Sequence, residues 1–299
     1  MRLVHCACDT DFTLVGTVGT VGADGAGSAV DVEEHRLPAI PSRKDLRFLD
    51  EVARLVLPVD PTPSLQEIAA SPSVSHLGEP TFAPQQPDSP LRVIVSGTDA
   101  ALSAVLTRMM RADYLWAEVA YLPMDPTSPA SVLWGLAELS DSERLALAIS
   151  GPVRPIPCIR NDSAVVVAGS AMLQHIDDAP YLGEIVVDNT VLVRGTGEPA
   201  RRGAVTPYGA RLVPTVSAPG LAAAAIVGPV KPPARRLPRL WGAREFVPSP
   251  LDPTHTPTGR ALQSGGQGIL VTIDGVPAKR PVERVTFYRH LRDIQAVRG

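Results

Sequence analysis

The secondary-structure signals of this 299-residue chain change character near residue 150, and this change limits the fold more than any single motif. In the first half, short apolar runs alternate with apolar stripes at helical spacing. Strands that alternate with helices are typical of a parallel sheet with right-handed crossovers. We therefore predict an α/β domain over residues 1–150, a parallel sheet flanked by helices. The strand signals lie at 91–96 and 117–122, and the helix signals at 45–56, 99–110 and 128–139.

After residue 150 the apolar runs are short, mostly β-branched and separated by turn residues. Asp188-Asn189 and Asp274-Gly275 are residue pairs typical of β-hairpin turns. We predict an antiparallel β-sandwich over residues 151–299. The strand signals lie at 163–168, 184–194, 210–216, 221–227, 268–273 and 284–289.

Composition narrows the functional classes. Hydrophobic residues make up 44% of the chain and aromatic residues 4%, so it can bury a sizeable, mainly aliphatic core. The formal net charge of −3 argues against charge-driven binding to nucleic acid or to an acidic membrane, so we expect at most a peripheral membrane contact. No segment approaches the roughly 18 apolar residues of a membrane span, so we expect a cytoplasmic protein. Few Lys and Asn beside abundant Ala, Val and Pro indicate a GC-rich bacterial genome, and whether the chain forms a homo-oligomer stays open.

The cysteines favour a reducing compartment. The three cysteines, Cys6, Cys8 and Cys158, cannot all pair with one another, and the Cys-x-Cys spacing is too tight for an unstrained disulfide. We predict free thiols on a buried N-terminal strand. The alternative is a metal site that adds His5, but the Cys-x-Cys spacing has no second pair to complete it.

Three segments show no regular periodicity. Residues 71–90 and 228–258 are rich in proline, and we predict loops there. The second loop carries several arginines around Trp241, and a phosphate or lipid surface contact is the alternative to a solvated loop. Residues 15–27 are rich in glycine but contain no phosphate-binding loop motif, so we predict a hairpin and loop. The arginines are Arg235, Arg236, Arg239 and Arg244.

Residues 93–105 read Val-Ile-Val-Ser-Gly-Thr-Asp-Ala-Ala-Leu-Ser-Ala-Val. This segment resembles the strand, turn and helix in which diacylglycerol kinases, related bacterial lipid kinases and NAD kinases carry Gly-Gly-Asp-Gly-Thr. Glycines after a strand let the backbone approach a phosphate, and amides at a helix N-terminus donate to it. Here the Cβ of Ala100 obstructs that approach, and Ala101 lacks the hydroxyl of the family's threonine. The resemblance implies a nucleotide site at this turn, and the alternative is an ordinary strand-to-helix turn capped by Thr98 or Asp99. The matching residues are Gly97, Thr98, Asp99, Ala100 and Ala101.

Residues 119–136 resemble the lipid-kinase segment Pro-x-Gly-Thr-Gly-Asn-Asp-x-Ala-Arg-x-Leu-Gly, with its first proline and last glycine at the same spacing. Asp-Pro-Thr-Ser-Pro, at 125–129, stands in place of Gly-Thr-Gly-Asn-Asp. The resemblance implies that Thr127 and Ser128 lie beside the nucleotide and makes Asp125 a candidate metal ligand. The proline at 126 removes a backbone donor that a phosphate would need.

Residues 259–289 resemble the last strands of the same family, in which an Asp-Gly-Glu turn precedes the final strands. In that family a carboxylate near this turn is thought to deprotonate the acceptor hydroxyl. The resemblance therefore makes Asp274 the candidate catalytic base. A hairpin turn without a catalytic role is the alternative.

Together the resemblances imply a fold of the diacylglycerol-kinase and NAD-kinase type, with ATP and Mg as cofactors and a lipid or nucleotide as ligand. They leave two hypotheses. In the first, the chain is a pseudoenzyme, a ligand- or partner-binding module of kinase ancestry with altered phosphate-binding motifs. In the second, it is an active ATP-dependent lipid kinase that uses a variant site.

Overall fold

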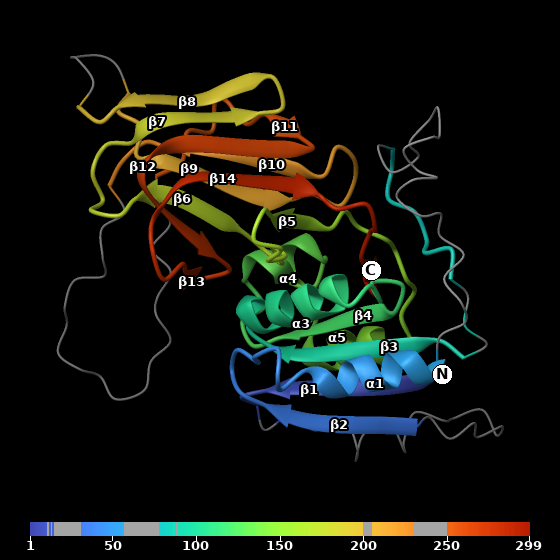
Figure 1. The fold of residues 1–299 in the computed structure, drawn as a ribbon. Coiled ribbons are helices and arrows are strands. Elements are labelled where there is room, and N and C mark those ends of the chain that lie inside the picture. Colours follow the sequence, from blue (N-terminus) through green and yellow to red (C-terminus); the bar gives the residue numbers. More distant parts are fainter. Residues whose placement is uncertain are drawn as a thin grey trace, which may run out of the picture. The chain divides into compact units, whose positions relative to one another are not determined.

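The computed structural model describes residues 1–10, 12, 14, 31–56, 78–85, 87, 89–199, 205–229 and 250–299. Contacts divide the chain into two compact units (Figure 1). Unit 1 combines Met1–Ser170, Pro214–Gly220 and Tyr288–Gly299, and unit 2 combines Ala171–Val213 and Leu221–Phe287. The glycine-rich stretch 15–27, the first part of the proline-rich loop 71–90, and the arginines and Trp241 of loop 228–258 lie outside the described residues.

Unit 1 is built on a parallel five-stranded sheet, which confirms the predicted α/β architecture. The predicted strands at 91–96 and 117–122 are the central strand, β3, and its neighbour β4. The strand order is β15-β4-β3-β1-β2. The strands are β1 Arg2–Cys8, β2 Asp31–Leu37, β3 Leu91–Gly97, β4 Glu118–Pro123 and β15 Gln295–Ala296.

The helices of the described part of unit 1 are α1 Arg47–Val56, α3 Asp99–Arg111, α4 Pro129–Leu133 and α5 Asp141–Ser150. The helix predicted through Leu139 is too long, because α4 ends at Leu133. Gly135 takes φ +71°, and the amides of Gly135 and Leu136 donate to the carbonyls of Val132 and Ser131. This is a Schellman cap, which closes the helix.

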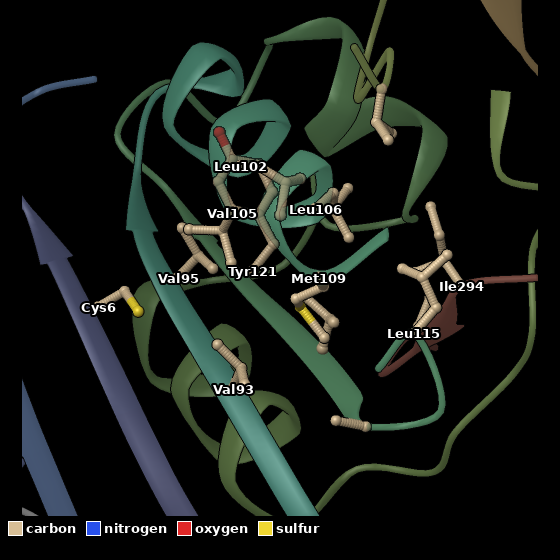
Figure 2. Close-up of a cluster of buried hydrophobic side chains, with 14 of the residues drawn as sticks. Cys6, Val93, Val95, Leu102, Val105, Leu106, Met109, Leu115, Tyr121 and Ile294 are labelled. Carbon is tan, nitrogen blue, oxygen red and sulfur yellow. The ribbon is translucent and has the colours of Figure 1, made fainter. Parts of the chain in front are cut away.

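The sheet separates two apolar clusters, because successive side chains of a strand point to opposite faces. On one face, Cys6, Val93 and Val95 pack under α1, α3 and α4. Figure 2 shows the stripe of α3 that meets them: Leu102, Val105, Leu106 and Met109, which are fully buried as their spacing predicts. On the other face, Leu3, Ile94 and Ala120 pack against the end of α5 at Ala148 and Ile149.

Antiparallel pairing dominates the second sheet, as predicted, with β12 pairing to β6, β7 and β13. Asp188-Asn189 joins β7 to β8 and Asp274-Gly275 joins β12 to β13, so both predicted hairpins are present. The central strand order is β11-β10-β9-β6-β12-β14-β5. The strands are β5 Ile159–Asn161, β6 Ala171–His175, β7 Leu182–Val187, β8 Thr190–Thr196, β9 Gly209–Pro214, β10 Leu221–Ile226, β11 Thr258–Gly259, β12 Ala261–Ile273, β13 Val276–Pro277 and β14 Val282–Arg289.

The strand predicted at 163–168 is wrong. Ala164 takes φ +58° in a tight turn, and the side chain of Asn161 accepts from the amide of Val165 at 2.8 Å. The Ser103 hydroxyl of α3 donates to the carbonyl of Val166 at 2.6 Å, and the amide of that residue donates to Thr107 at 2.9 Å. Side chains of a helix therefore bind the backbone groups that a strand ladder would use.

The prediction of free, buried cysteines is confirmed for Cys6, Cys8 and Cys158. Burial raises the pKa of the Cys8 thiol and of the Cys158 thiol to about 12, so both stay protonated at neutral pH. Within the described residues, no helix is both long and apolar enough to cross a membrane.

Candidate functional site

The turn between β3 and α3 holds the five residues that the first motif singled out. Gly97 ends β3, and a Cβ there would lie 2.9 Å from the Cβ of Cys8 and 3.2 Å from its carbonyl oxygen, so only glycine fits without displacement. Thr98 is the N-cap of α3, and its hydroxyl accepts from the amide of Ala101 at 3.3 Å. Ala100 and Ala101 are buried in the first turn of the helix.

Asp99 is the centre of the hydrogen-bond network at this turn. Its side chain is buried, and the structure brings three donors to it. Oδ1 accepts from the Tyr121 hydroxyl at 2.9 Å and from the Ser128 hydroxyl at 2.6 Å. Oδ2 accepts from the amide of Ala130 at 3.0 Å. One carboxylate therefore ties together the β3–α3 turn, strand β4 and the start of α4.

The second motif meets the first at this carboxylate. Ser128 is the N-cap of α4, and its hydroxyl accepts from the amide of Ser131 at 3.2 Å while donating to Asp99. Gly169 backs the network, since a Cβ there would lie 2.6 Å from both Oδ2 of Asp99 and the amide nitrogen of Ala130. The N-termini of α3 and α4 thus converge on one buried carboxylate.

This arrangement gives the first turn of α4 an internal anion. Amides at a helix N-terminus attract negative charge, and in phosphate sites they donate to the ligand. Here the amide of Ala130 donates to Asp99 instead. A phosphate at the same position would meet a carboxylate whose three donors are two hydroxyls and a backbone amide, none of them a basic side chain.

Asp125 and Thr127 form a separate, exposed turn. The amide and the hydroxyl of Thr127 donate to Oδ1 of Asp125 at 2.8 and 2.7 Å. In the described part of the chain, no three His, Cys, Asp or Glu side chains gather as metal ligands would. The Asp125 carboxylate is engaged by Thr127 here, and its role as a metal ligand stays a prediction.

Asp274 lies in unit 2, on the two-residue turn between β12 and β13. Asp274 and Gly275 have φ of 48° and 81°, as a type I′ turn requires. The structure therefore gives Asp274 a turn-forming role, and its role as a base stays a prediction.

Sequence reasoning missed Tyr121, Ala130 and Gly169. Tyr121 occupies an inward position of β4 and is 2% exposed, and a buried tyrosine hydroxyl needs a partner, which is the signal that could have found it. No local pattern in the sequence could show that Gly169 contacts Asp99, because the two residues are 70 positions apart and meet only when the chain folds.

No family model and no curated protein matches the chain. Solved structures do. A putative diacylglycerol kinase from Bacillus anthracis str. Sterne is 9% identical with a TM-score of 0.55, over 100% of this chain and 96% of that chain. A further diacylglycerol kinase structure from the same organism is 9% identical with a TM-score of 0.53 and the same coverage. An NAD kinase from Archaeoglobus fulgidus in complex with ATP is 12% identical with a TM-score of 0.47, over 98% and 92% of the two chains.

The architecture and the likeness to the two diacylglycerol kinase structures define the fold. The chain has a diacylglycerol-kinase-like fold, with a parallel α/β sheet and a largely antiparallel second sheet. Identity of 9% to the solved structures carries the fold and not the activity.

Proposed function

We propose that this chain is a ligand- or partner-binding module on a diacylglycerol-kinase-like fold, with no phosphoryl transfer at the turn 97–101. The observation that carries the proposal is the buried carboxylate of Asp99, which accepts from Ser128 and Ala130 where two helix N-termini meet. An anion supplied by the chain occupies the position to which a phosphate would be drawn.

The size of the effect supports this proposal. Two unit negative charges 4 Å apart repel by about 4 kcal/mol at an effective dielectric constant of about 20. That repulsion corresponds to roughly a thousandfold loss in affinity for a phosphate. Moving the carboxylate aside would leave the amide of the fully buried Ala130 without the acceptor it has here.

The second candidate function is an active ATP-dependent lipid kinase, with Asp125 at the metal and Asp274 as base. It is favoured by the fold and by the retention of Gly97 and Asp99 from the family motif. It requires at least about 8 kcal/mol of barrier lowering, with an exposed Asp125 and with Thr98 and Ala100 in place of two of the family's three glycines. In either case we propose a cytoplasmic bacterial protein whose ligand is lipid-like or nucleotide-like.

The two functions predict opposite signs for one substitution. Asp99→Asn removes the internal negative charge and keeps the side-chain shape. If the carboxylate excludes phosphate, calorimetry with Mg-ATP should show no saturable binding by the wild type and measurable binding by Asp99→Asn. If Asp99 serves a working nucleotide site, the wild type binds and Asp99→Asn weakens binding. Asp125→Asn, which makes the same charge change on the exposed turn, is the matched control.

A second variant tests the backbone part of the proposal. Thr98→Gly with Ala100→Gly returns the family's glycines, at a helix cost of about 1 kcal/mol or less for each. We expect this variant to gain Mg-ATP affinity only in the Asp99→Asn background, because the charge outweighs the methyl group. Ala104→Gly, in the middle of α3, controls for a generally loosened helix.

A further inference from the structure

A second polar cluster lies on the opposite face of the parallel sheet, away from Asp99. Nε2 of His5 lies 2.7 Å from the Ser96 hydroxyl oxygen, and Nδ1 of His5 lies 3.1 Å from Oε2 of Glu34. The three side chains come from the neighbouring strands β3, β1 and β2. Serine, histidine and carboxylate are thus joined in the order that nucleophilic catalysis requires.

The hydrogen bonds fix the roles of the two imidazole nitrogens. A carboxylate only accepts, so Nδ1 carries the hydrogen that is donated to Glu34, and Nε2 is left to accept from the Ser96 hydroxyl. The amide of Leu14 also donates to Oε2 of Glu34, at 2.9 Å, which holds the carboxylate in place. Burial lowers the pKa of His5 below its ordinary value, more than Glu34 raises it, so the imidazole is unprotonated at neutral pH and its Nε2 can accept a proton.

His5 is fully buried and Ser96 is nearly so on this face of the sheet. Leu3 and Ile94 precede His5 and Ser96 by two residues on the same face, and they belong to the apolar cluster that covers the amino-terminal half of the strands. Ser96 lies one residue before the carboxyl end of β3, the end at which parallel sheets bind ligands, and His5 and Glu34 lie at the middle of β1 and β2. Ser96 retains 3% exposure, and the Phe12 ring that meets His5 edge-on is 38% exposed.

We propose that Ser96 is an activated nucleophile that takes an acyl group from a small, uncharged ester, with His5 as its base and Glu34 as a positioning residue. The Ser96 oxygen forms a bond to the acyl carbon, and its proton passes to Nε2 of His5. The ester C–O bond breaks, and the leaving alcohol takes that proton. Water then attacks the acyl-serine with His5 again as base, and a carboxylic acid and free Ser96 result. An apolar acyl group suits the neighbouring Leu14 and Phe12.

The test is covalent labelling of the full chain with a fluorophosphonate probe, in which a phosphorus–oxygen bond to serine forms and fluoride leaves. We expect one adduct, located at Ser96 by peptide mapping, and its absence in Ser96→Ala. His5→Gln should slow labelling at least a hundredfold. The labelling rate of the wild type should be half-maximal below pH 6.5, following the lowered pKa of His5.

Two further variants separate catalysis from folding. Ser103→Ala removes a buried hydroxyl on the other face of the sheet and should label as the wild type does. Ser96→Cys keeps a nucleophile beside His5 and should react with iodoacetamide faster than the buried Cys6 and Cys8. Absence of any adduct, an adduct that persists in Ser96→Ala, or an unreactive cysteine at position 96 in a folded variant would overturn the proposal. These outcomes do not depend on nucleotide binding at Asp99.

Discussion

Replacing Asp99 with alanine removes a buried acceptor that three donors share. The Tyr121 hydroxyl can turn to the carbonyl of Gly97, from which it already lies 3.1 Å, and the Ser128 hydroxyl can rotate. The amide of Ala130 cannot rotate, and its residue is fully buried. An orphaned buried amide costs about 1–3 kcal/mol, and a hydroxyl that exchanges a charged acceptor for a neutral one loses about 1 kcal/mol. We therefore expect Asp99→Ala to lower the free energy of unfolding by about 3 kcal/mol.

Asp99→Asn should cost less, about 1 kcal/mol, because its remaining oxygen can turn to Ala130 and the two hydroxyls can reverse to accept from the amide. Urea unfolding followed by tryptophan fluorescence measures both changes, since Trp116 and Trp134 are buried in unit 1. Asp125→Ala, on the exposed turn, should stay within about 0.5 kcal/mol of the wild type. An Asp99→Ala variant as stable as Asp125→Ala, or an asparagine variant less stable than the alanine variant, would refute the reasoning.

Two other substitutions test separate parts of the account. Gly169→Ala places a Cβ 2.6 Å from Oδ2 of Asp99 and from the amide nitrogen of Ala130, so it should destabilise unit 1 by about 2 kcal/mol; Gly265→Ala, which meets nothing within 4 Å, should be nearly neutral in the same urea titration. Burial and two neighbouring guanidinium groups lower the pKa of His290 to about 4. Between about pH 6.5 and pH 4 the imidazole of His290 is therefore protonated in the unfolded chain and unprotonated in the native chain. The unfolding free energy is unaffected by this group above about pH 6.5 and falls as the pH is lowered towards 4, by up to about 3 kcal/mol. His290→Gln should flatten that part of the profile of unfolding free energy against pH, and an unchanged slope would contradict the assignment.

Much of the fold could be predicted because its signals are local. The stripe of α3 and the apolar run of β3 show their spacing in the sequence itself, and the Asp-Gly turn at 274–275 sets its own hairpin. The end of α4 was missed although Gly135 marks it, because the apolar pattern continues past that glycine. The capping box of α5, Ser140 with Glu143, was also present in the sequence.

The remaining features depend on contacts between distant residues. The β-branched run at 163–168 forms a turn because Ser103 and Thr107 of α3 bind the backbone of Val166. Residues 214–220 and 288–299 likewise belong to unit 1, although the segments before them belong to unit 2. Their amino-acid composition does not indicate this change of unit. Local propensity is overridden in such places by tertiary hydrogen bonds.

The candidate site divides in the same way. Motif spacing indicated the residues of the two turns, and the structure places Gly97–Ala101 and Ser128 together around one carboxylate. The sequence could not show that Asp99 is fully engaged by the protein, because Tyr121 and Gly169 approach it from other parts of the chain. That engagement is the basis of our proposal that this turn does not bind phosphate.

The amide of Ala130 reports most directly on whether the chain binds phosphate here. In a deuterated, 15N-labelled sample its NMR resonance can be followed while Mg-ATP is added, beside the amide of Ala101 at the start of α3. Because the negative charge of Asp99 repels a phosphate at this position, we predict that neither resonance moves in the wild type at millimolar Mg-ATP and that both move in Asp99→Asn. Saturable shifts of both amides in the wild type, with diacylglycerol phosphorylated by the same sample, would contradict the account.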